Sequence, residues 1–101
     1  MTTKAAVRFH LGPIVATPGA LEALGRNQTT GIEYLQRHVQ GDWGEVCDDD
    51  KEANNQAIID GSRILSSYLL TDGTKLWIIT DAEIDTQHHR QATTFLLPDE
   101  Y

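Results

Sequence analysis

The chain has 101 residues, of which 40% are hydrophobic and 23% are charged, and its formal net charge is -7. These values are typical of one globular domain and exclude a disordered chain. No apolar run approaches the roughly 20 residues of a membrane-spanning helix. The N-terminus lacks the apolar stretch of a secretory signal. The eight Lys and Arg residues form no basic stripe of the kind that binds nucleic acid. We therefore expect one cytoplasmic domain over residues 1–101 that binds neither a membrane nor, directly, a nucleic acid.

The N-terminal part predicts a strand followed by a short helix. Residues 7–16 alternate apolar and polar side chains at first, which indicates a strand with a bend at its Gly-Pro pair, because proline cannot donate to a sheet. Thr17 before Pro18 is typical of a helix N-terminus. Gly25 is expected to end this helix.

Two more helices are expected before the middle of the chain. Thr30 and Glu33 fit a capping box, and the apolar residues that follow at helical spacing predict a helix that ends near residue 41. A second box-like start predicts a helix over residues 50–60 that stops at Gly61. Its apolar face is thin, so we expect it to lie on the surface.

The C-terminal half carries the strongest structural signal. Residues 63–71 and 74–81 are rich in β-forming residues and are joined by Asp-Gly, the preferred pair of a two-residue hairpin turn. That turn predicts a register in which Tyr68 faces Trp77 on one side of the sheet, and residues 93–97 predict a third strand. The fold class is therefore α+β, a small antiparallel β-sheet of three or four strands with two or three short helices on one face.

Residues 42–60 concentrate negative charge, with seven carboxylates against one base, Lys51. Their spacing does not match a calcium loop. Helix capping with a solvated acidic surface explains them in structural terms, because carboxylates at a helix start are stabilised by the helix dipole. The functional interpretation is a docking surface that steers a protein with a basic surface or imitates the charge of a nucleic acid.

Three aromatic residues could add binding energy to such a surface. Trp43 lies between two glycines and either folds back onto the core or contacts a partner. Tyr68 and Trp77, if exposed, are natural anchors, because Trp and Tyr dominate binding hot spots; helices of the chain or a second copy in a homodimer could instead cover them. The residues that we expect at the partner surface are Asp42, Trp43, Glu45, Asp48, Asp49, Asp50, Tyr68 and Trp77.

The histidines offer an alternative. His38 on the second predicted helix, together with His88 or His89 in the loop after the hairpin, could form the acid–base pair of a small nuclease or toxin. The structural interpretation is that all three are surface histidines. The chain has no metalloprotease motif, no zinc tetrad and no phosphate-binding glycine loop, so we expect no metal, no cofactor and no catalytic residue.

Two short motifs carry a resemblance to a known family. The chain has Gly-Asp-Trp-Gly at residues 41–44 and Leu-Leu-Pro-Asp-Glu-Tyr at residues 96–101. Together with residues 12–24 and 72–80, these resemble a family of small proteins usually labelled only plasmid-related or hypothetical. The loop at residues 82–91 departs from the family by being longer and richer in histidine. The resemblance implies a mobile-element context and carries over no catalytic residue.

These observations lead to one main hypothesis. The chain is expected to be a small, acidic, non-enzymatic interaction protein of a mobile element. It would bind, and could inhibit, a host protein that handles nucleic acid or serves in defence, in the manner of anti-restriction or anti-CRISPR proteins. The small nuclease built on His38 is the alternative.

Overall fold

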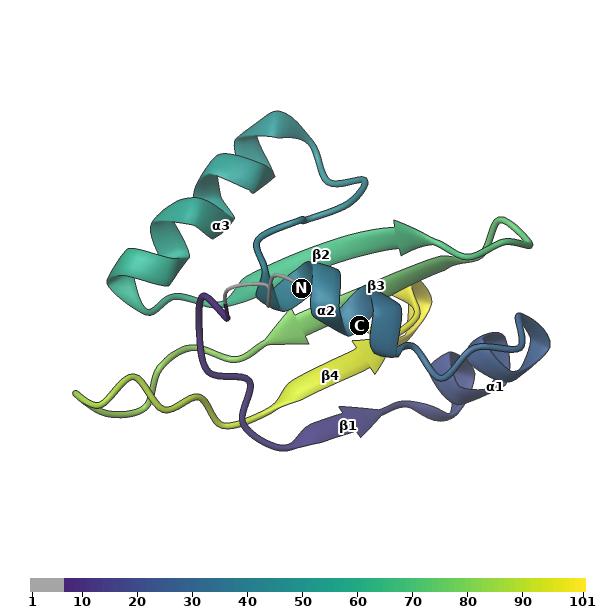
Figure 1. Cartoon of the computed structure of the whole chain (residues 1–101), viewed down its shortest axis with the longest axis horizontal. Helices are drawn as coiled ribbons and strands as arrows, with labels where there is room; N and C mark the ends of the chain where they lie inside the picture. The colour runs from purple at the N-terminus through teal and green to yellow at the C-terminus, as the bar shows by residue number, and fades with distance from the viewer. Residues whose placement is uncertain (1–6) are drawn as a thin grey trace, which may run out of the picture.

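A computed structural model describes residues 7–101 as three helices and one four-stranded sheet (Figure 1). In chain order the elements are β1 (Ile14–Ala16), α1 (Pro18–Arg26), α2 (Ile32–Val39), α3 (Asp48–Asp60), β2 (Ile64–Leu69), β3 (Lys75–Thr80), β4 (Thr93–Leu96) and a 3₁₀ turn at Pro98–Glu100. The strand order is β1-β4-β3-β2. The predicted α+β class is confirmed. None of the helices in the described residues has the length and apolar character that crossing a bilayer requires.

The sheet is mixed, which corrects the prediction of a purely antiparallel one. β2, β3 and β4 are antiparallel neighbours, whereas β1 lies parallel to β4 with Val15 opposite Thr94. The strand predicted over residues 7–16 is also much shorter than expected. Gly12 adopts a φ of +64° and Pro13 follows it, so the chain enters the sheet only at Ile14. The segment before this bend lies outside the sheet and places Phe9 in the core.

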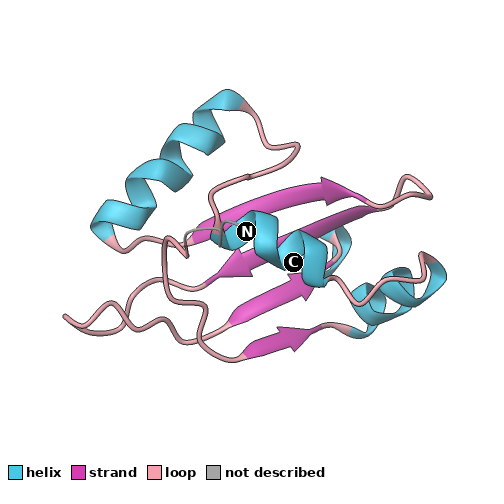
Figure 2. Ribbon diagram, in the orientation of Figure 1, coloured by secondary structure: helices cyan, strands magenta, loops and turns pink. Residues whose placement is uncertain are grey.

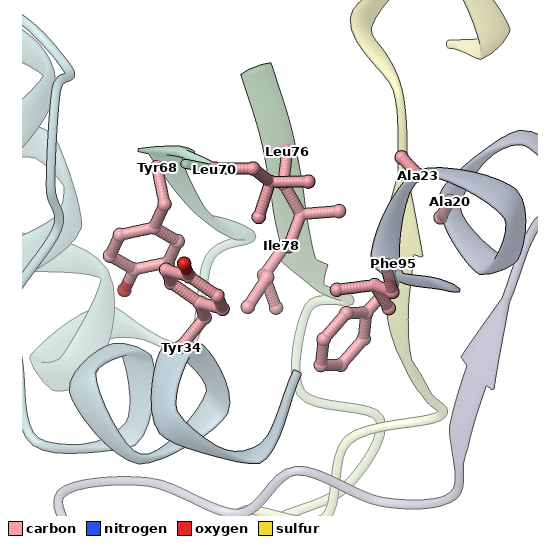
Figure 3. Packing of buried hydrophobic residues seen from close by; sticks show 9 residues of the cluster. Ala20, Ala23, Tyr34, Tyr68, Leu70, Leu76, Ile78 and Phe95 are labelled. Carbon is pink, nitrogen blue, oxygen red and sulfur yellow. The ribbon is translucent and has the colours of Figure 1, made fainter. Parts of the chain in front are cut away.

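α1 and α2 cover one face of the sheet. Figure 3 shows Tyr34 of α2 beside Tyr68 of β2, with Phe95 of β4 next to α1. The ring centroids of Tyr34 and Tyr68 are 5.6 Å apart. Two alanines of α1, Ala20 and Ala23, are fully buried, which allows this helix to approach the strands closely.

α3 lies along the outer edge of β2 rather than on the face with α2 (Figure 2). The buried side chain of Asn54 accepts from the N–H of Leu65 at 3.1 Å and donates to its carbonyl at 2.7 Å. At Ser67 the N–H donates to the carbonyl of Trp43, and the carbonyl accepts from the N–H of Glu45. These contacts pair an edge that would otherwise expose free backbone groups, and they attach the acidic segment to the sheet.

The hairpin register differs by one residue from the prediction. The N–H of Leu70 donates to the carbonyl of Thr74, so the loop holds three residues and Gly73 takes a φ of +87°. Tyr68 therefore lies opposite Leu76, and Trp77 lies opposite Ser67. Because side chains alternate between faces, Tyr68 and Trp77 are on opposite sides of the sheet.

Helix ends are partly as predicted. Thr17 is the N-cap of α1, and its hydroxyl accepts from the N–H of Ala20. The helix continues one residue past Gly25, however, and ends at Arg26.

The capping boxes predicted for α2 and α3 are absent. Gly31 is the N-cap of α2, and the carboxylate of Glu33 accepts from the hydroxyl of Thr29 instead of reaching a backbone N–H. α3 begins at Asp48, after Cys47, which makes no side-chain cap. The predicted stop at Gly61 is confirmed.

Two glycines with similar backbone angles should respond differently to substitution. Gly44 and Gly73 have φ values of +73° and +87°; an added Cβ at Gly44 would lie 2.0 Å from the carbonyl oxygen of Ser67, but at Gly73 it would meet nothing within 4 Å. We expect Gly73→Ala to cost about 1–2 kcal/mol, the usual penalty of this conformation. Gly44→Ala should cost about 3 kcal/mol or more, because the backbone must also move. Urea unfolding of both variants measures this; equal losses would mean that the chain does not approach β2 so closely at Gly44.

Candidate functional site

Five exposed carboxylates, here called the acidic cluster, lie on the loop before α3 and on its first turns. They are Glu45, Asp48, Asp49, Asp50 and Glu52. Within residues 7–101 none of them forms an ion pair. The three aspartates of the first turn are stabilised by the helix dipole. The charges of Glu45 and Glu52 are not compensated by any ion pair within residues 7–101.

Asp42 is also exposed, but it is separate from the acidic cluster because its carboxylate is paired within the chain. One carboxylate oxygen accepts from Nε of Arg37 at 2.8 Å, and the other accepts from the N–H of Gly44 at 3.2 Å. The hydrogen bond from Arg37 is the main reason that the pKa of Asp42 is lowered. Asp42 thus holds the turn between α2 and α3.

Trp43 is buried, with 3% of its surface exposed. Its ring packs against Phe9 and His38, and its indole N–H donates to the side-chain oxygen of Asn55 at 3.0 Å. Of the two interpretations of this residue, the structure supports the one in which it folds back onto the core. Trp43 is therefore removed from the expected contact residues.

Tyr68 is also removed, because only 1% of it is exposed. Its hydroxyl donates to the carbonyl of Asp42 at 2.6 Å, and the guanidinium of Arg37 lies over its ring. Burial raises the pKa of this phenol. The one-residue shift in register is the physical reason, since it moves Tyr68 to the face that the helices cover.

Trp77 is half-buried on the opposite, helix-free face, where it meets a residue that sequence reasoning missed. Tyr101 is 69% exposed, and its ring lies edge-on to Trp77 at 5.8 Å and under the guanidinium of Arg63 at 5.4 Å. Arg63 and Asp50 line one pocket of about 200 Å³. The acidic cluster and the aromatic pair Trp77–Tyr101 are therefore neighbouring parts of one surface. The only sequence signal for Tyr101 was its place in the C-terminal motif.

His38 is the centre of a buried polar network that the sequence did not reveal. Its side chain is fully buried, which corrects the expectation of a surface histidine. Nδ1 lies 2.5 Å from the hydroxyl of Ser66 and Nε2 lies 2.9 Å from that of Thr80. Thr80 lies 2.8 Å from the hydroxyl of Thr93, which donates to the carbonyl of Leu11 at 2.7 Å.

The last bond of this network fixes the direction of the others as far as Nε2 of His38. A carbonyl only accepts, so Thr93 donates to Leu11 and must accept from Thr80. Thr80 in turn accepts from Nε2–H of His38, and in the neutral imidazole Nδ1 then accepts from Ser66. The neutral imidazole therefore satisfies every member of the network. Burial, and secondarily the charge of Arg90, lowers the pKa of His38 from 6.5 to about 3.

This geometry does not favour the nuclease hypothesis. His38 has no exposed surface and both of its ring nitrogens are engaged, so it cannot exchange a proton with a substrate. His88 and His89 lie in an exposed loop, where their Nδ1 atoms contact Glu83 at 3.1 Å and Asp85 at 2.8 Å. Within the described residues, no three His, Cys, Asp or Glu side chains are arranged to hold a metal ion.

Comparison with protein-family models, with curated proteins and with solved structures finds no match to the chain.

The network makes stability depend on pH. Because the folded state lowers the pKa of His38 to about 3, the unfolded chain binds an extra proton below pH 6.5, and stability falls as the pH drops. The loss between pH 7.5 and pH 5 should be about 2 kcal/mol. The carboxylates with lowered pKa values lose their contribution only nearer pH 4, so they act outside this range.

Urea unfolding at several pH values measures this loss. His38→Gln should be less stable at pH 7.5 but should show a flatter dependence on pH, whereas His10→Gln at an exposed position should keep the slope of the unmodified protein. An equal loss in all three proteins would contradict the assignment to His38.

Proposed function

We propose that the protein is a small, non-enzymatic interaction protein whose acidic cluster binds a basic surface of a protein partner. The observation that carries this proposal is that Glu45, the three aspartates of the first turn of α3, and Glu52 are all exposed and without ion pairs in the described residues. Like charges so close together repel one another, and a cationic partner would remove that repulsion while neutralising the field.

The aromatic pair beside the cluster supports a protein as the partner. Trp77 and Tyr101 offer apolar area next to Arg63, and these three residue types dominate hot spots of protein interfaces. A negative surface of this kind repels nucleic acid, whose phosphates carry the same sign. It suits the basic surfaces with which other proteins bind nucleic acid.

The biological setting rests on the family resemblance. Small proteins of mobile elements would benefit from blocking a host nucleic-acid-handling or defence protein in the cytoplasm, and an acidic surface can compete for the site that receives phosphates. An anti-restriction or anti-CRISPR-like inhibitor is therefore the specific form of the proposal. The nuclease alternative has no observation in its favour, since His38 is enclosed in the core.

Neutralising the acidic cluster should weaken partner binding. A variant with Asp48→Asn, Asp49→Asn and Asp50→Asn removes three charges that lie outside the core, so we expect a folded protein whose affinity for the captured partner falls at least about tenfold. The difference should shrink as salt rises from about 0.05 to 0.3 M, because screening shortens the reach of the field. The partner is captured from host lysate with the full chain, and its affinity for each variant is then measured.

A second triple variant controls for total charge. Glu22→Gln, Glu33→Gln and Asp99→Asn change the net charge equally at exposed positions outside the cluster. This variant should bind as the unmodified protein does. Equal losses in both variants, or binding that does not respond to salt, would refute the acidic cluster as the binding site.

A further inference from the structure

A second site lies outside the acidic cluster. A pocket of about 540 Å³ opens between the segment at residues 7–12 and the loop that follows β3. Phe9 and Leu11 provide apolar lining, and Arg8, His10, His88 and Glu83 provide polar lining. This volume is within the range of small-molecule sites, which combine an apolar body with a few polar groups.

The walls of the pocket are held in place by the core. Phe9 is only 7% exposed, and its ring packs edge-on against His38 at a centroid distance of 5.2 Å. The N–H of Arg8 donates to the carbonyl of Val39 at 3.0 Å. Across the opening, the ring of His10 meets that of His89 at 5.6 Å. A preformed pocket of this kind loses little entropy when a ligand enters.

The charged residues that line the pocket are one arginine and one glutamate, whereas the whole chain has a net charge of -7. The guanidinium of Arg90 is buried beneath the pocket, 5.7 Å from the centre of the Phe9 ring. Glu83 is the one carboxylate that lines the pocket; its oxygens contact His88 at 3.1 Å, and one lies 3.6 Å from Arg90. Arg8 forms no ion pair within residues 7–101. With Glu83 turned to His88 and Arg90, Arg8 is the cation of the lining that remains for a ligand.

We propose that this pocket binds a small organic carboxylate with an aromatic or aliphatic body. The apolar body would lie against Phe9 and Leu11, and Arg8 would pair with the carboxylate, for which a guanidinium offers two parallel donors. His10 and the Nε2 atom of His88 supply further polar contacts at the rim. Among the described residues that line the pocket, Arg8 is the single arginine, which suits a monoanion, and there is no glycine-rich phosphate loop that a nucleotide would need.

The test is an NMR titration of the full ¹⁵N-labelled chain with 2-naphthoate and, separately, with the uncharged 2-naphthalenemethanol. The carboxylate should cause saturable shifts at residues 8–12, 83 and 88, and it should bind about tenfold more tightly than the alcohol. Arg8→Gln should remove most of this preference and leave the weak binding of the alcohol unchanged. Arg26→Gln, an exposed arginine on α1, is the matched control and should keep the preference.

Four outcomes of the titration would overturn the proposal. They are equal affinity for the carboxylate and the alcohol, saturable shifts that map elsewhere, no saturable binding at all, and equal behaviour of the two arginine variants. Contacts between residues 1–6 and the Phe9 ring in the unliganded chain would also overturn it, because the chain itself would then fill the pocket. Since Arg8 is exposed, its replacement leaves the fold intact, which a spectrum without ligand verifies.

Discussion

The hydrogen-bond chain through His38 is the constraint on which the rest of the structure depends. It starts at Ser66 of β2, passes through His38 of α2 to Thr80 of β3 and Thr93 of β4, and ends at the carbonyl of Leu11. A buried polar group left without a partner costs about 1–3 kcal/mol, so sliding α2 along the sheet would leave several such groups unpaired. Apolar packing alone tolerates small shifts more readily. The network therefore fixes where α2 lies, and with it the turn that leads to α3.

The Gly-Asp-Trp-Gly motif is explained by that turn rather than by function. Gly41 and Gly44 take positive φ values, Asp42 pairs with Arg37, and Trp43 closes the core over His38. The C-terminal motif is similar, because Glu100 accepts from the hydroxyl of Thr17 and the N–H of Gly19 at the start of α1. The two motifs on which the resemblance rests therefore stabilise the turn before α3 and the contact between the C-terminal segment and α1. The groups that are free to contact a partner are the carboxylates of the acidic cluster, which follow the first motif.

Features that depend on neighbouring residues could be predicted from the sequence. Features that depend on contacts between residues far apart in the chain could not. The Thr17 cap, the Gly61 stop and the existence of the hairpin follow from neighbouring residues. The register did not follow, because Asp-Gly also fits a three-residue loop with glycine in the left-handed position. One residue of slip was enough to exchange Tyr68 and Leu69 between the two faces. His38 was predicted to lie on the surface for a related reason. Its hydrogen-bond partners are hydroxyls of β2 and β3, and the sequence of α2 gives no sign of them. The acidic cluster was found correctly as an exposed segment, but its aromatic neighbour Tyr101 came from the opposite end of the chain.

The two proposed sites lie near opposite ends of α3. Its N-terminal end carries Asp48–Asp50, where the helix dipole is positive, and at its C-terminal end Arg90 donates to the carbonyls of Ala57 and Ser62. In Figure 1 the loop after β3 approaches this C-terminal end, where the N–H of Glu83 donates to the carbonyl of Gly61. The buried guanidinium of Arg90 thus serves the end of the helix and also lies against the Phe9 ring that lines the pocket. Because the pocket and the acidic cluster share no residue and lie at opposite ends of the helix, a result that removes one of them leaves the physical case for the other unchanged.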